Sequence, residues 1–270
     1  MRAESAGDRD LLARLEQYYD TAPRANCSVE TVGPFTLFVG REGWPYYARP
    51  TLGSAGPFLG EDVRRVLARQ AEVEVPKAIE WVAQVTPGLV PAARAAGLQV
   101  REIPLLVLTE LRVPVECPWS VVSLDSVHPA LAATQAAIHL GFGQLDTERG
   151  AAGPEARDAW VRDNGEKGIA AVRRMLERDV VDMVSASGPQ GVVGGGMFIA
   201  RGEVAEIVGV ATLPSARCEG VAAAVTAGLA ARAQARGVRV VFLSAQSEQV
   251  ARMYRRVGFR DVATACIAEG

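Results

Sequence analysis

The sequence predicts an α/β protein with α+β-type mixed sheets, divided into two domains. Short apolar runs typical of strands recur along the whole chain, and segments with helical apolar spacing separate them. A chain of 270 residues also exceeds the usual size of a single domain. The apolar fraction of 49% and the charged fraction of 22% are those of an ordinary globular protein.

In the first half, helices and strands alternate between turns rich in proline and glycine. Leucines and a tyrosine at helical spacing predict an amphipathic helix over 10–19. Further helices are expected at 61–71 and 89–96, and strands at 35–39, 44–49, 78–85 and 103–111. Prolines bracket a short polar stretch at 114–118, which we interpret as the seam between a domain over 1–115 and a domain over 118–270.

After the seam the pattern restarts. Strands are expected at 121–124, 180–185, 191–199, 204–212, 238–243 and 262–267, and helices at 129–140, 155–177, 221–236 and 248–257. The run VRVVFL at 238–243 is typical of a strand buried on both faces. Three successive glycines at 194–196 lie inside a strand pattern with no helix after them, so we expect a bulge or a close approach to substrate there.

Composition and charge exclude several classes of function. A net charge of −2 provides no basic field for a nucleic acid. The polar N-terminus has no signal-peptide core, and no apolar run of about 18 residues exists to cross a membrane. The scattered cysteines indicate free thiols in a reducing cytoplasm. His128 and His139 fit neither common spacing of zinc ligands, so no metal is expected.

One segment of the second half has the features of an anion-binding loop. The strand over 204–212 ends before Pro214, and a short loop passes through Gly220 into the helix over 221–236. Glycine allows a ligand to approach the backbone closely, and a helix N-terminus offers unpaired N–H groups and partial positive charge. Phosphate binding is the functional interpretation. An ordinary strand–loop–helix connection has the same features.

The order of residues along 204–259 resembles the GNAT superfamily of N-acetyltransferases. Arg217-x-x-Gly220-x-Ala222 matches the family's loop motif, [Arg/Gln]-x-x-Gly-x-[Gly/Ala]. At the family's spacing a helix follows that carries Tyr254 and ends in Gly-Phe. The resemblance implies a mostly antiparallel mixed sheet flanked by helices, and an N-acyltransferase that uses acetyl-CoA or another acyl thioester as co-substrate, without a metal.

The first half resembles a degenerate copy of the same domain. Aligning Gly97 with Gly258 places Leu98 on Phe259 and Ala93 on Tyr254, and the loop motif is missing. The resemblance therefore implies a tandem protein of two GNAT-like domains, of which only the second binds the donor.

The resemblance also implies which residues contact the donor. The pantetheine arm would lie where the strand over 204–212 splays from its neighbour, against Val208, Val210, Ala211 and Thr212. The phosphates would lie on Arg217, Cys218, Glu219, Gly220, Val221 and Ala222. Ser247 occupies the position where relatives have an asparagine that contacts the donor, although it also suits the N-cap of the last helix.

Two residues take the positions of the family's catalytic groups. Tyr254 would protonate the departing thiolate, and Glu206 would accept the proton of the acceptor amine. Each has a structural alternative, since Tyr254 has the helical spacing of a core aromatic and Glu206 could lie on a solvated face.

Three hypotheses on function follow. The first is acyl transfer from CoA to a primary amine of a small molecule. Glu219 favours the second, a donor held by an acyl or peptidyl carrier protein, because a carboxylate about 6 Å from a phosphate charge costs roughly 3 kcal/mol at an effective dielectric of about 20. The third is a non-catalytic acyl-CoA-binding protein, against which Tyr254 argues.

Overall fold

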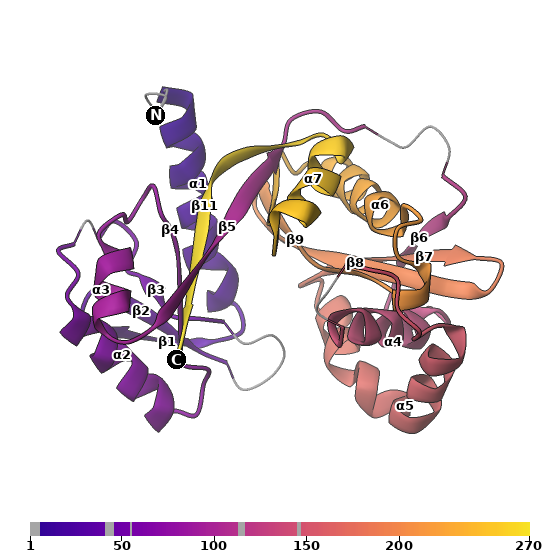
Figure 1. Cartoon of the computed structure of the whole chain (residues 1–270), viewed down its shortest axis with the longest axis horizontal. Coiled ribbons are helices and arrows are strands. Elements are labelled where there is room, and N and C mark those ends of the chain that lie inside the picture. Colours follow the sequence, from indigo (N-terminus) through magenta and orange to yellow (C-terminus); the bar gives the residue numbers. More distant parts are fainter. Residues whose placement is uncertain (1–5, 41–45, 55, 113–116, 145–146) are drawn as a thin grey trace. The chain divides into compact units, whose positions relative to one another are not determined.

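The computed structural model describes residues 6–40, 46–54, 56–112, 117–144 and 147–270 (Figure 1). Its contacts group into two compact units, and neither unit is continuous in sequence. The first comprises Met1–Leu106, Ser244–Glu248 and Asp261–Gly270, and the second comprises Val107–Leu243 and Gln249–Arg260. The domain boundary at 115–118 remains a prediction.

The first unit contains three helices, a small antiparallel sheet and a second group of strands. The helices are α1 (Ala6–Arg24), α2 (Gly60–Glu72) and α3 (Leu89–Ala95), and the small sheet has the order β1 (Ser28–Val32), β2 (Phe35–Val39) and β3 (Arg49–Pro50). The other strands are β4 (Ala78–Val82), β5 (Gln99–Leu108) and β11 (Phe259–Glu269). The strand β1 was not expected from the sequence, and part of the strand expected at 44–49 falls outside the described residues.

The last strand of the chain completes the sheet of the first unit. β11 lies between β4 and β5 and pairs antiparallel with β4, with Cys266 opposite Trp81. Cys266 and Ala268 are fully buried, and they join a core that includes Trp81 and Phe35. The first unit therefore depends on residues from the opposite end of the sequence.

The second unit is a layered α/β structure. Its part of the eight-stranded sheet has the order β10 (Val240–Ser244), β9 (Val204–Thr212), β8 (Gly191–Arg201), β7 (Asp182–Gly188) and β6 (Ser120–Leu124). The strands β6 to β9 are antiparallel neighbours, whereas β10 runs parallel to β9. The helices α4 (Leu131–Phe142) and α5 (Pro154–Glu177) cover one face, and α6 (Val221–Ala235) and α7 (Glu248–Val257) lie over the other (Figure 1). The predicted fold class, mixed sheets flanked by helices, is confirmed.

The three successive glycines of β8 allow helices to approach both faces of the sheet. A Cβ atom on Gly195 would lie 2.3 Å from the Thr134 methyl group of α4. Equivalent atoms on Gly194 and Gly196 would lie 2.8 Å from Val221 and 3.1 Å from Leu229, both on α6. Side chains at these positions would separate the layers, so packing accounts for the glycine run.

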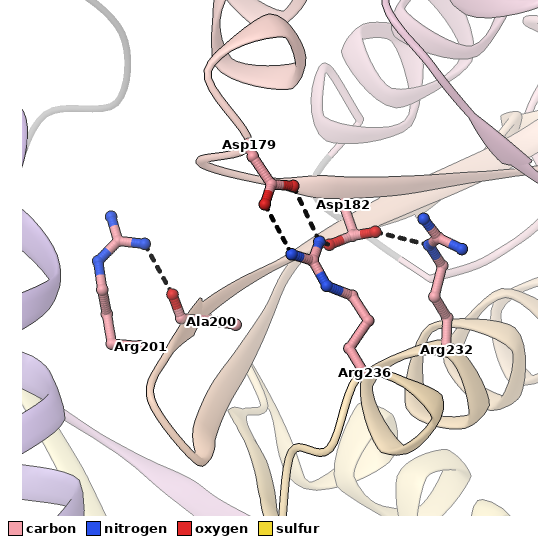
Figure 2. A network of polar contacts seen from close by, with 6 residues as sticks. All are labelled: Asp179, Asp182, Ala200, Arg201, Arg232 and Arg236. Carbon is pink, nitrogen blue, oxygen red and sulfur yellow. Dashed lines mark hydrogen bonds and ion pairs between the residues drawn. The ribbon is translucent and has the colours of Figure 1, made fainter.

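A polar network fixes the C-terminal end of α6 to the start of β7 (Figure 2). Asp182, whose side chain is only 6% exposed, accepts a hydrogen bond of 2.5 Å from Arg232 and a second one from Arg236. Arg236 also binds Asp179, and this hydrogen-bonded ion pair holds the pKa of Asp179 below its usual range. The buried carboxylate is thus compensated by two guanidinium groups, as its desolvation requires.

Two glycines at corresponding positions support the internal repeat. Gly97 follows α3 and Gly258 follows α7, with φ of 90° and 114°, and the next residues, Leu98 and Phe259, are buried. At Gly258 the backbone approach is also close, since a Cβ atom would lie 1.7 Å from the carbonyl oxygen of Glu110.

The helix expected at 155–177 is not continuous. Gly165 has φ 47° and ψ −135°, which interrupts α5 and divides it into two helical pieces. Glycine adopts this conformation without the steric cost that a side chain would add. Among the described residues, the structure contains no helix with the length and apolar character to cross a membrane.

Candidate functional site

The parallel strands β9 and β10 form a fork. Their pairing runs from Val204 opposite Val240 to Glu206 opposite Phe242, while β9 continues to Thr212. Directly after β10, the N–H group of Ala245 donates to the carbonyl of Pro104 in β5 at 2.9 Å. Past Glu206, the edge of β9 that faces away from β8 is therefore not paired with β10. This is the splay that the family resemblance implies.

A bulge shapes the far part of β9. Gly195 of β8 is opposite Ala211, and Met197 is opposite Val208. Two residues of β9, at 209 and 210, therefore lie opposite a single residue of β8. The first of them, Gly209, has φ 65°.

The backbone of Thr212 points into the fork. The N–H group of Leu213 donates to Val193 of β8 at 2.8 Å. Because successive backbone groups of a strand point to opposite edges, the groups of Thr212 are directed away from β8. Here lie the residues predicted to bind the pantetheine arm, of which Val208 and Val210 are half-buried and Ala211 and Thr212 are buried.

Glu206 lies at the branch point of the fork, on the α4 face of the sheet. Its partner on β8 is Ile199, which alternates with Phe198 and so shares the face of Met197 and Gly195. That face packs against α4, as the close approach of Gly195 to Thr134 shows. The flanking residues of β9, Ala205 and Ile207, are buried on the opposite face, whereas Glu206 is half-buried.

Tyr254 is on α7, over the α6 face of the sheet (Figure 1). Its side chain is 7% exposed, and its ring centroid lies 6.0 Å from that of Phe259. Burial raises the pKa of its phenol, because desolvation disfavours the phenolate. The hydroxyl is therefore protonated at neutral pH. This environment suits both a proton donor and a core aromatic.

The loop before α6 contains two residues with positive φ. Cys218 and Gly220 have φ of 65° and 82°, a conformation that builds anion-binding concavities. Trp119 donates its indole N–H to the carbonyl of Glu219 at 2.8 Å, and since the peptide is trans, the N–H of Gly220 points the opposite way. The first intrahelical bond runs from Ala224 to Gly220 at 3.0 Å, so the N–H groups of 221–223 precede the helical ladder.

Arg217 fastens this loop to the connection between α4 and α5. Its guanidinium donates to the carbonyls of Gly141 at 2.7 Å, Gln144 at 2.9 Å and Glu148 at 3.2 Å. Backbone bonds from Gly150 to Pro214 and from Ser215 to Ala152 continue the attachment. The Arg217 side chain thus holds the loop, and its contact with the donor stays a prediction.

Glu219 is paired. Its carboxylate accepts a hydrogen bond from Arg149, and this ion pair is partly exposed. Sequence reasoning missed Arg149 and Trp119, because both lie far from the loop in sequence and belong to no motif. The guanidinium of Arg149 therefore compensates the negative charge of Glu219.

The remaining predicted site residues differ in burial and in position. Val221 has a fully buried side chain that packs on β8, so only its backbone can serve a ligand, whereas Ala222 is half-buried. Cys218 is exposed, and its sulfur lies 3.8 Å from the carbonyl oxygen of Thr147. Ser247 lies just before α7 and belongs to the first unit, and its contact with the donor stays a prediction.

Comparison with known proteins agrees with this geometry. Residues 147–259 match the family described as "Acetyltransferase (GNAT) family". No curated protein matches the chain. A GCN5-related N-acetyltransferase from Kribbella flavida has a similar structure, with a TM-score of 0.68 and 19% identity over 96% of this chain and 95% of that chain.

Two further solved structures are similar over most of this chain. A GCN5-related N-acetyltransferase-like protein from Streptococcus suis has a TM-score of 0.55 and 12% identity, over 97% of this chain and 98% of that chain. A tandem GNAT protein from the clavulanic acid biosynthesis pathway has a TM-score of 0.53 and 12% identity, over 87% of this chain and 78% of that chain.

The fold is thus that of the GNAT N-acetyltransferases, in the tandem form. The match to the GNAT acetyltransferase family is confined to residues 147–259. Members of this family transfer an acyl group from an acyl-CoA. Most of the matched segment, with β9, the loop before α6 and Tyr254 of α7, belongs to the second unit, whereas 244–248 belong to the first.

Proposed function

We propose that this protein transfers an acetyl or other acyl group from CoA to the amine of a small molecule. The observation that carries the proposal is the fork of β9 and β10, which opens at Glu206 and continues to the N–H-rich loop before α6. A thioester can lie along the free edge of β9 with its phosphates at that loop.

The reaction follows from the groups around the fork. The neutral amine attacks the thioester carbonyl, and a backbone N–H around Val210–Thr212 stabilises the oxyanion of the tetrahedral intermediate. When this intermediate collapses, the carbon–sulfur bond breaks and the thiolate takes a proton from Tyr254. Glu206 takes one proton from the acceptor's ammonium before the attack, directly or through water. The nitrogen loses its second proton as the amide forms, and through water this proton restores the phenol of Tyr254. The products are an amide and the free thiol of CoA.

The raised pKa of Tyr254 is compatible with proton donation. Desolvation disfavours the phenolate, but it disfavours the thiolate of the leaving group in the same dry environment as well. The difference between the two acids is therefore smaller than the burial of Tyr254 alone suggests.

Free CoA is the donor that the loop favours. The argument for a carrier-bound donor was the charge of Glu219 beside the phosphates, and Arg149 compensates that charge. A thioester on a carrier protein keeps the same chemistry and is the second candidate.

The test is release of free thiol from acetyl-CoA with a panel of primary amines. Amine-dependent release, with the acetylated amine found by mass spectrometry, is the expected result. Tight binding of acetyl-CoA without turnover on any amine would instead favour a non-catalytic acyl-CoA-binding protein. Turnover with an acyl carrier protein but not with CoA would favour the second candidate.

A further inference from the structure

We propose that Arg149 binds the donor's phosphates directly, and that Glu219 holds this guanidinium at the loop until the donor arrives. The inference rests on the proposed function and adds a residue outside the family motif. It assigns Glu219 a positioning role in place of a repulsive one.

The motif's own cation is already engaged. Arg217 directs both terminal nitrogens of its guanidinium to backbone carbonyls of 141–148, and one of these nitrogens serves two carbonyls. Moving it to a phosphate would break these three hydrogen bonds and leave two backbone bonds to attach the loop to the α4–α5 connection. The side chain that defines the motif is therefore a poor phosphate ligand in this protein.

Arg149 has the exposure and the position next to the loop that a phosphate ligand needs. Its side chain is 58% exposed. It forms an ion pair with the carboxylate of Glu219, the loop residue next to Gly220. The backbone around it is fixed, because the N–H of Gly150 donates to Pro214 at 3.0 Å. A planar guanidinium also matches the oxygens of a phosphate in a bidentate arrangement.

The present partner of Arg149 is readily exchanged. Glu219 is itself 38% exposed, and ion pairs between exposed side chains contribute little to stability. A diphosphate offers Arg149 more charge and more acceptor oxygens than one carboxylate. The guanidinium can keep one N–H on Glu219 and direct the others to the donor, since it carries five donors.

Two roles for Arg149 make different predictions. If Arg149 only neutralises Glu219, replacing Arg149 weakens donor binding only while Glu219 carries its charge. If Arg149 contacts the phosphate, replacing it still weakens donor binding when that carboxylate is absent. A double-mutant cycle separates the two roles.

The experiment is calorimetry of acetyl-CoA binding to the wild type, Arg149→Gln, Glu219→Gln and the double variant. We expect Arg149→Gln to weaken binding roughly tenfold, and to weaken it by a smaller but measurable factor in the Glu219→Gln background, where the guanidinium is no longer positioned. Acetyl-pantetheine, which lacks the nucleotide and its phosphates, should bind all four proteins equally. Arg239→Gln is the matched control, because it breaks an exposed pair with Glu203 beyond the other end of α6.

The outcomes are distinct. No effect of Arg149→Gln, or an effect that disappears in the Glu219→Gln background, would overturn this inference and leave the proposed function intact. A wild type that binds no acetyl-CoA would overturn the proposed function, and this inference with it. Thermal unfolding of each variant confirms that the fold is retained.

Discussion

Glu206 is the last residue of β9 that pairs with β10, and its partner there is Phe242. The pair marks the point where the two strands separate, so the one carboxylate of β9 stands where the free edge begins. Burial of the neighbours Ala205 and Ile207 on the other face fixes its direction. A base at this point would face an amine that attacks a thioester lying along β9.

Replacing Glu206 by Gln should lower kcat/KM by about 100-fold, the usual contribution of a general base. An alkylammonium with a pKa near 10.4 is almost wholly protonated at neutral pH, so the loss should shrink for acceptors of lower pKa. Initial rates across a series of amines measure this dependence. Glu203→Gln, at the exposed turn before β9, is the control and should leave the rates unchanged. An equal loss for all amines would argue for a structural role of Glu206.

Replacing Tyr254 by Phe should lower kcat by about 10- to 100-fold while acetyl-CoA binding is retained, because the proton donor is lost and the ring is kept. Steady-state kinetics and calorimetry separate the two quantities. Tyr18→Phe, which removes the hydroxyl of a buried tyrosine in α1, should change neither. Full turnover by Tyr254→Phe would assign this residue to the core.

The raised pKa of Tyr254 also predicts how stability depends on pH. In the unfolded chain its pKa is about 10, so the unfolded state loses this proton first as pH rises. Below that value the contribution to stability is fully present, and it is lost as pH rises toward the higher pKa of the folded state. From about pH 9 to about pH 11, the range around the reference tyrosine pKa, the Tm of the wild type should fall more steeply than that of Tyr254→Phe.

Local patterns predicted the elements around the site, whereas contacts between distant segments were not predictable. The bounds of β9 and α7 agree with those expected, since apolar spacing and terminal glycines are local signals. The pairing of Arg149 with Glu219 leaves no such signal, because it depends on how the α4–α5 connection lies against the loop. The same holds for β11, whose apolar alternation predicts a strand but not its partner.

The glycine run of β8 offers a test of packing against ligand binding. Gly195→Ala should destabilise the protein by about 1–3 kcal/mol, because its Cβ atom would clash with the methyl group of Thr134 and the carbonyl of Val184. Chemical denaturation measures the change. Gly88→Ala is the control, since a Cβ atom there meets nothing within 4 Å and φ is −70°. Unchanged stability with weakened substrate binding would move this residue from the core to the ligand site.

Deleting 261–270 should unfold much of the first unit, even though the residues removed are the last of the chain. The deletion removes β11 from between β4 and β5 and opens a core that contains Cys266 and Ala268. Hydrogen exchange should show lost protection in β4 and retained protection in β7 and β8, which lie in the second unit. Glu269→Lys, an exposed change on the same strand, should leave exchange in β4 nearly unchanged. Retained protection of β4 in the deletion variant would mean that the first unit folds without the C-terminal strand.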